Sequence, residues 1–160
     1  MADADLKELF ERVKQCFPEE KRALFREPTG EALWEHLSGE LQNGYVRRWF
    51  EVTEGMQADE PFCNGLRLVS TAQSIALKYL LTRAPDGDGR SFDRHWFPIA
   101  DGVSEYLVVD ERDGRLLRVF RGYYWPHDVA PSLEAWLGDL ARDAGTGLMQ
   151  WRSEYGLVDV

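Results

Sequence analysis

Apolar residues recur at helical spacing through the first third of the chain. A first stripe, which places its side chains on one helical face, consists of Leu6, Leu9, Phe10, Val13 and Phe17. Pro18 ends this helix, and a second helical arm is expected from Glu19. After a break at 28–30, the spacing predicts a helical segment over 31–41 and another from Tyr45 that stops at Gly55. The first third is therefore predicted to be helical.

The period changes in the middle of the chain. The segment 66–69 is short and prone to form a strand, and Ser70 or Thr71 can cap the helix that follows. The apolar face of that helix is expected to carry Ala72, Ala76, Tyr79 and Leu80. The polar run 85–91 indicates a surface loop. Three strands follow over 96–100, 106–109 and 116–120, with Asp113-Gly114 as a turn, and we expect them to pair antiparallel.

A last helix is predicted from Ser132 to Gly145, which is placed to end it. The remaining residues, 146–160, are compatible with a packed extension or with a frayed tail. The length of 160 residues fits one domain, and helices flanking short strands suit a sheet packed against helices. We therefore expect a single domain over 1–160.

Composition and charge narrow the classes of partner. With 44% hydrophobic residues, among them eight Phe, six Tyr and six Trp, the chain can fill a core without disulfides or a metal. Its 28 acidic and 19 basic residues give a formal net charge of -9, and the acids are spread along the chain. Nucleic-acid binding is disfavoured because it needs clustered Lys and Arg. The same sign of charge suits a basic protein as partner.

The cysteines and the N-terminus indicate a cytoplasmic protein. Cys16 and Cys63 have no Cys-x-x-Cys spacing, as expected for reduced thiols. The first residues are acidic and no apolar signal segment follows them. The longest largely apolar stretch, 75–81, is too short to span a bilayer, so no membrane association is expected.

No motif in the sequence predicts catalysis, a metal or a cofactor. His36, His95 and His127 are far apart, and a dyad of His95 with Cys16 or Cys63 is left open without local support. Asp86, Asp88 and Asp93 fail the spacing of a calcium loop. We expect the protein not to be an enzyme. The alternative, a site that the sequence does not reveal, would require a pocket where a His and a Cys, or two carboxylates, converge.

Two further features concern the surface. Arginines recur at a spacing of three, at Arg112, Arg115, Arg118 and Arg121. In a strand this spacing alternates between faces, and we expect exposed charges paired with the neighbouring acids. Trp125 lies in the aromatic but aperiodic run 122–126 and is the tryptophan that we single out for exposure, although a core position is favoured.

Four segments occur in an order that is known from one family. They are Leu41-Gln-Asn-Gly-Tyr45 through Trp49-Phe50 to Gly55, the strand and helix over 66–75, the run Trp96-Phe-Pro98-Ile-Ala-Asp101-Gly102 with its following apolar strand to Asp110 and Gly114, and the helix 132–140. Over about residues 31–144 this order resembles the SUKH superfamily, which includes the Smi/Knr-type domain of yeast cell-wall regulators. Departures are Gln42 for Pro, Glu54 for Asn, Ile99 for Phe, and 103–105 for a Gly-Asp-rich turn.

The resemblance implies an α+β fold in which helices pack against an antiparallel sheet, mostly without enzymatic activity. The N-terminal arm 1–30 and the C-terminal extension 145–160 lie outside it. The matched motif residues have structural roles in this reading: Tyr45, Gly55, Trp96, Pro98, Asp101, Gly102, Asp110 and Gly114. Trp96 and Pro98 suit an edge or first strand, where a missing N–H donor is tolerated.

Bacterial members of the family are often immunity proteins that neutralise toxins. The leading hypothesis is therefore an immunity protein that binds a cognate toxin, such as a basic nuclease. The alternative is a Smi/Knr-like regulatory scaffold with a non-toxin partner. The candidate contact residues are Trp125 and loop acids for which the sequence suggests no intramolecular role: Asp59, Glu60, Asp86, Asp88 and Asp93.

Overall fold

A five-stranded antiparallel sheet forms the centre of the computed structural model, which describes residues 5–28, 44–83 and 91–160. Its strands, in order across the sheet, are β1 (Arg67–Leu68), β2 (Trp96–Asp101), β3 (Glu105–Asp110), β4 (Leu116–Phe120) and β5 (Tyr123–Ala130). A smaller sheet pairs β6 (Met149–Arg152) with β7 (Gly156–Asp159). The helices are α1 (Leu6–Lys14), α2 (Glu19–Arg22), α4 (Gly44–Phe50), the short 3-10 turn η1 (Gln57–Asp59), α5 (Thr71–Arg83) and α6 (Leu133–Gly145). The protein thus has the predicted α+β fold.

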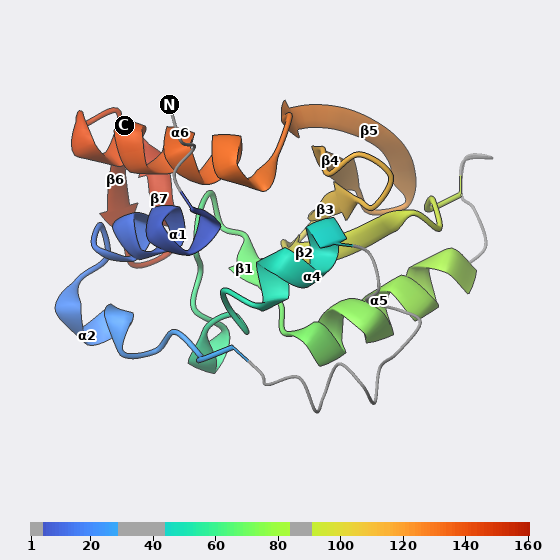
Figure 1. Ribbon diagram of the computed structural model, residues 1–160, viewed down its shortest axis with the longest axis horizontal. Coiled ribbons are helices and arrows are strands. Elements are labelled where there is room, and N and C mark those ends of the chain that lie inside the picture. The colour runs from blue at the N-terminus through green and yellow to red at the C-terminus, as the bar shows by residue number, and fades with distance from the viewer. Residues whose placement is uncertain (1–4, 29–43, 84–90) are drawn as a thin grey trace.

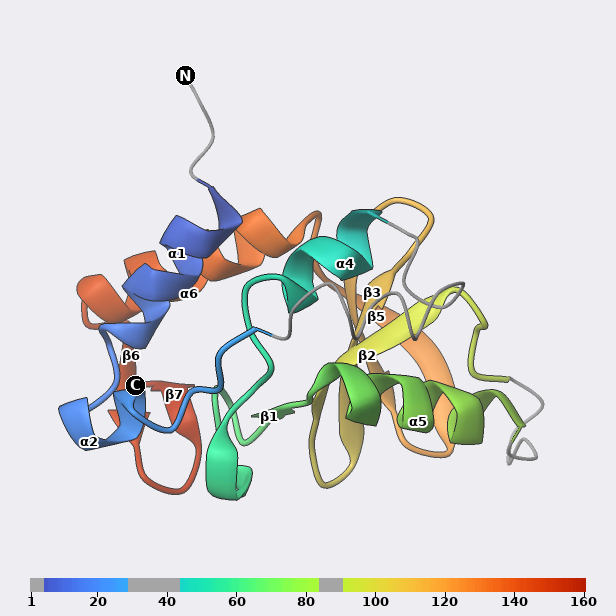
Figure 2. The ribbon, with the colours of Figure 1, turned by 60° about the horizontal axis from the view of Figure 1, so that its bottom comes forward.

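Helices cover both faces of the sheet. On one face, α1 and α6 run side by side, and a large apolar cluster joins them to α4, to the β6–β7 pair and to the sheet (Figure 1). On the other face, α5 lies along β2 (Figure 2). A smaller cluster on this face contains Leu81, Phe92, Trp96, Tyr106, Val108, Leu117, Val119 and Tyr124. The core therefore has two parts, separated by the sheet.

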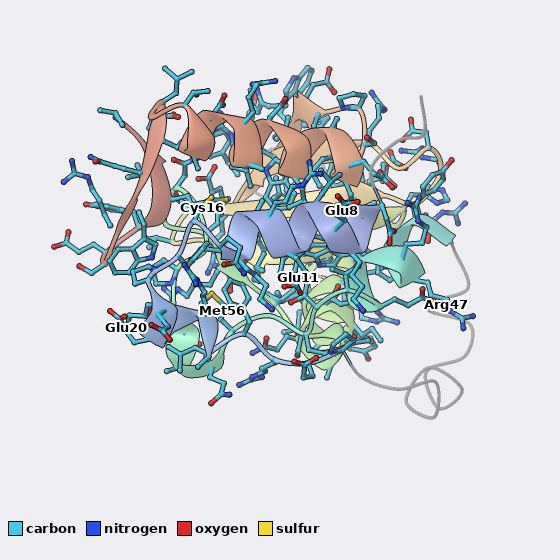
Figure 3. The ribbon with its side chains drawn as sticks, turned by 60° about the vertical axis from the view of Figure 1, so that its left-hand side comes forward. Glu8, Glu11, Cys16, Glu20, Arg47 and Met56 are labelled. Atoms are coloured by element: carbon cyan, nitrogen blue, oxygen red, sulfur yellow. The ribbon has the colours of Figure 1, made fainter. Side chains whose placement is uncertain are left out.

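The N-terminal helix has the predicted amphipathic pattern. The predicted apolar residues of α1 are buried, and Phe17 beyond its end is also buried. Its outward side carries Glu8 and Glu11, which pair with Arg12 at 2.6 Å and with Lys14 at 3.3 Å (Figure 3). In the described ranges, none of the helices is long and apolar enough to cross a bilayer. The helix predicted over 31–41 lies outside the described residues. The same holds for the predicted loop 85–91, apart from its last residue, Ser91.

The three predicted strands pair antiparallel as expected, but the sequence did not predict β5. This strand pairs with β4 through a register that shifts twice, between Leu116 and Leu117 and between Arg118 and Phe120. At the second of these shifts, residues 124–126 lie across from Val119 alone, so the two strands do not pair in step and the run 122–126 is hard to recognise as a strand. The C-terminal residues form a packed extension, because Met149 and Leu157 are buried.

The predicted caps form, but the predicted apolar face of α5 does not point inward. Ser70 Oγ accepts from the Gln73 N–H at 3.1 Å, while the Gln73 side chain accepts from the Ser70 N–H at 2.8 Å, so the two residues form a capping box. Ala72, Ala76, Tyr79 and Leu80 are all exposed. The buried residues of α5 are Thr71, Ser74 and Leu81.

Hydrogen bonds explain why polar side chains of α5 are buried. Ser74 Oγ donates to the carbonyl of Pro98 in β2 at 2.5 Å. The Glu54 carboxylate accepts from the Thr71 N–H at 2.8 Å and also from its hydroxyl group. The Ser74 bond ties α5 to β2, and the Thr71 bonds tie its first turn to Glu54, the residue before Gly55, so these buried polar groups are satisfied. Leu77 and Leu81 add apolar contacts with the smaller cluster.

The motif residues lie at turns and in the sheet. Gly55 has φ +84°, and a Cβ there would lie 2.8 Å from the Leu68 carbonyl oxygen. Gly114 has φ +79° and packs against the ring of Tyr45. The Gly102 N–H donates to the Glu105 carbonyl at 2.8 Å, which closes the β2–β3 turn. These positions admit no side chain without strain or displacement.

The expectation that Pro98 lies in an edge or first strand is wrong for the sheet as a whole, because β2 is the second strand. However, β1 pairs only with Ala100 and Asp101. The Pro98 carbonyl faces Ser74 of α5, and the N–H that proline lacks would point the same way in an antiparallel strand. The missing donor therefore breaks no bond between strands.

Candidate functional site

Two of the predicted contact acids have partners inside the protein. Glu60 Oε1 lies 2.7 Å from Lys21 Nζ. Asp93 accepts from the His95 N–H at 2.8 Å and lies 3.2 Å from Arg112 Nη2. The premise that these acids have no intramolecular role is therefore wrong for both. Asp86 and Asp88 lie outside the described residues.

The remaining acid, Asp59, is exposed in η1 and lies away from Asp93. Its charge acts on Asp101 at the end of β2, where burial raises the pKa of the Asp101 carboxyl, Arg121 and Arg67 lower it, and Asp59 raises it. Asp93 instead precedes the start of β2. Six residues of strand cover about 17 Å, so the predicted acids do not form one patch.

Asp93 belongs to a structural network around the buried carboxylate of Asp110. Arg112 Nη2 and Nε lie 2.7 and 2.9 Å from the Asp110 oxygens. Burial raises the pKa of the Asp110 carboxyl, but hydrogen bonds from Arg112 and the charges of Arg112 and Arg115 together outweigh it, and the net pKa is lowered. The network ties the β3–β4 turn to the segment that precedes β2.

The candidate cysteine–histidine dyad does not assemble. His95 Nδ1 lies 2.9 Å from Glu111 Oε1, and no cysteine is among its contacts within the described residues. Burial, with a smaller effect of Glu105, raises the pKa of the Cys63 thiol to about 12. Burial also raises the pKa of Cys16, against the opposing charge of Arg22, and its thiol donates to the Arg12 carbonyl at 3.5 Å. Neither thiol is activated as a nucleophile.

Metal ligands are likewise not gathered. Across residues 5–28, 44–83 and 91–160, no three His, Cys, Asp or Glu side chains form a group that would hold an ion. His36 is outside these ranges, and His127 is on β5.

The arginines at spacing three are paired with acids, as predicted. Arg115 Nε lies 2.7 Å from Asp113, Arg118 Nε 3.4 Å from Glu105, and Arg121 Nη2 3.6 Å from Asp101. Their charges are thereby locally compensated, although each guanidinium remains about half exposed.

Aromatic residues gather beside these arginines on one face of the sheet. Arg118 lies directly opposite His127, and Phe120 directly opposite Tyr123, and residues opposite one another in an antiparallel pair share a face. The Phe120 and His127 rings meet edge to face with centroids 5.5 Å apart. Trp125 lies between the two pairs along β5. We call this surface, formed by Arg118, Phe120, Tyr123, Trp125 and His127, the β4–β5 face.

The β4–β5 face is open because the helices pack elsewhere on the sheet. Tyr123 is 48% exposed and Trp125 is 50% exposed, so the favoured core position of Trp125 is wrong. The large apolar cluster reaches β4 and β5 only at Leu116 and Ala130. On β5, Tyr124 turns into the smaller cluster on the other face, while Tyr123 and Trp125 remain open to solvent.

The chemistry of this face suits contact with another protein. Trp, Tyr and Arg are the residue types that most often dominate binding energy at protein interfaces. The adjoining pocket, of about 310 Å³, is shallow and is lined by Arg115, Asp128, Val129, Ala130 and Pro131. A broad surface of this kind differs from the enclosed clefts that hold small ligands.

Comparison of the sequence with models of known protein families finds no match, and comparison with curated proteins finds none either.

Sequence reasoning identified Trp125 but missed Tyr123 and His127 as its neighbours. Their signal is the alternation of positions 123, 125 and 127, which becomes readable only when 123–130 is taken as a strand. The two register shifts concealed that strand.

Proposed function

We propose that this protein is a non-enzymatic protein-binding module, an immunity protein that binds and neutralises a cognate bacterial toxin through the β4–β5 face. The observation that carries the proposal is the pair of half-exposed aromatic side chains, Tyr123 and Trp125, beside the guanidinium of Arg118 on one edge of the sheet. The order of sequence motifs, which resembles the SUKH superfamily, supports the choice of a toxin as partner.

Burial of the aromatic side chains would supply the affinity. Large aromatic rings bury much apolar area while they lose little rotamer entropy, which makes them effective anchors. A stable complex would bury about 1,600 Å² in total, more than the aromatic pair alone provides. The flanking ion pairs of Arg118 and Arg121 would then form the polar rim.

The net charge of -9 would act at longer range. It attracts a basic partner, such as a nuclease that binds phosphates, and raises the rate of encounter. The carboxylates need not touch the partner to have this effect. Salt should therefore slow association more than it speeds dissociation.

A direct test is co-expression with the toxin-like product of a neighbouring gene. We expect cells that carry both genes to survive and the two proteins to co-elute on a sizing column. The double variant Tyr123→Ala with Trp125→Ala should lose both effects. Tyr155→Ala is the matched control, because Tyr155 is 47% exposed but lies between β6 and β7.

Death of cells that carry both wild-type genes, with no complex on the column, would contradict the proposal. If the complex forms with the double variant but is lost with Tyr155→Ala, the β4–β5 face is not the binding surface. Stable capture of a non-toxin partner through the same face would favour the regulatory scaffold instead.

A further inference from the structure

The outer side of α5 carries an apolar stripe that is largely exposed. Ala72, Ala76, Tyr79 and Leu80 share one helical face, and Tyr79 and Leu80 are 57% and 63% exposed. The stripe runs for about 12 Å along the helix, or rather more than two turns. Because the sheet side of α5 is held by Ser74 and Leu81, the helix does not need this stripe for its own packing.

A basic pocket adjoins the stripe. It has a volume of about 220 Å³ and is lined by Ile75, Lys78, Tyr79, Thr82, Arg83 and Arg94. The sequence of α5 contains no acidic residue, although the chain as a whole has a charge of -9. The charged residues that line this pocket are therefore all basic, in contrast to the acidic balance of the chain.

The two arginines of the pocket contact an aromatic ring and an imidazole ring. The Arg83 guanidinium lies 3.6 Å from the centre of the Tyr79 ring, and its Nη1 donates to the Tyr79 carbonyl at 3.3 Å. Arg94 Nε lies 3.4 Å from His95 Nε2. Within the described parts of the chain, neither arginine has a carboxylate at ion-pair distance, in contrast to the arginines of β4 and its turns.

We propose that the outer face of α5 is a second docking surface, which takes an acidic amphipathic helix from a partner protein. Its apolar side chains would lie on Tyr79 and Leu80, and its carboxylates would pair with Arg83 and Arg94. Recognition of a helix fits a stripe with helical periodicity, and guanidinium groups that pair with no carboxylate of the described residues favour an acidic partner. A second copy of this face is disfavoured because it would bring like charges together.

This inference does not depend on the proposed function, since the two surfaces lie on different elements and differ in charge. A suitable experiment displays a library of 18-residue helical peptides and selects binders to the full chain. We expect the selected sequences to combine apolar residues at intervals of three and four with flanking Asp or Glu. In amide NMR spectra, a selected peptide should shift signals of α5 and of 91–95.

Charge reversal provides the decisive comparison. The double variant Arg83→Glu with Arg94→Glu should bind the selected peptide at least about tenfold more weakly. A peptide with Lys in place of its acids should regain binding to this variant. The control double variant, Arg26→Glu with Arg152→Glu, changes the net charge equally at two exposed sites outside the pocket and should keep full affinity.

The Trp125→Ala variant should also keep full affinity for the peptide, which separates this inference from the proposed function. The inference is overturned if selection yields no binders, if the binders lack acidic residues, or if the signal shifts fall outside α5 and 91–95. Equal weakening by the control double variant would also overturn it. If a DNA or RNA oligonucleotide binds the wild type and the Arg83→Glu, Arg94→Glu variant loses this binding, the surface is assigned to nucleic acid instead.

Discussion

Gly55 shows how one residue fixes the path of the chain between α4 and β1. Its φ of +84° is in the left-handed region, and the Leu68 carbonyl oxygen would lie 2.8 Å from a Cβ. The backbone of Leu68 belongs to β1, which cannot move aside without loss of its pairing with Ala100. The requirement for glycine therefore has two causes, backbone conformation and close approach.

Replacement of Gly55 by Ala separates these causes when it is compared with Gly122→Ala. Gly122 has a similar φ of +78°, but a Cβ there would meet no atom within 4 Å. We expect Gly122→Ala to lower the free energy of unfolding by about 1 kcal/mol and Gly55→Ala by about 2 kcal/mol more. Urea denaturation measures both values. Equal losses would show that the close approach to Leu68 has no cost.

Asp110 makes stability depend on pH. Because its folded-state pKa is lowered, its charged form stabilises the fold above the ordinary carboxyl pKa of about 3.9. This contribution is lost as pH falls through the lowered folded-state pKa. Wild type should therefore be more stable than Asp110→Asn at pH near 7, and the difference should shrink below pH of about 4. Denaturation at a series of pH values tests this, and a constant difference would contradict it.

At the scale of residues, the sequence predicts turns better than it predicts the ion-pair partners of side chains. Asp113-Gly114 is readable as a turn because left-handed backbone favours glycine. The partners of Glu60 and Asp93 are not readable, because Lys21 and Arg112 are distant in sequence and meet only through the fold.

At the scale of elements, the local sequence of α5 determines where the helix begins but not which of its faces is buried. Its start is readable, since the box of Ser70 and Gln73 is local. Its buried face is not readable, because hydrogen bonds to Pro98 and Glu54 replace apolar packing at Ser74 and Thr71. Hydrophobic periodicity accordingly predicted the exposed face as the buried one.

The cap of α5 can be tested by substitution. Ser70→Ala removes the acceptor for the Gln73 N–H and should lower the free energy of unfolding by about 1 kcal/mol. Ser153→Ala, at an exposed turn position, should change it by less than about 0.5 kcal/mol. Thermal unfolding of the two variants provides the comparison. An unchanged midpoint for Ser70→Ala would exclude a contribution of the cap.

At the scale of the whole molecule, the sequence predicted helices packed against an antiparallel sheet. It did not predict where the surface is open, because that depends on how far α6 reaches across β4 and β5. Two open surfaces result, the β4–β5 face and the outer face of α5. They differ in chemistry, since carboxylates pair with the arginines of the first, while the arginines of the second have no carboxylate partner among residues 5–28, 44–83 and 91–160.

We propose that the β4–β5 face anchors a toxin, and calorimetric titration tests this role most directly. An inactivated toxin from the neighbouring gene would be titrated into wild type, the Trp125→Ala variant and the Tyr155→Ala variant. We predict that Trp125→Ala costs at least about 2 kcal/mol of binding free energy, or roughly thirtyfold in Kd, and that Tyr155→Ala has little effect. Equal affinity of wild type and Trp125→Ala, or no binding by wild type, would contradict the account.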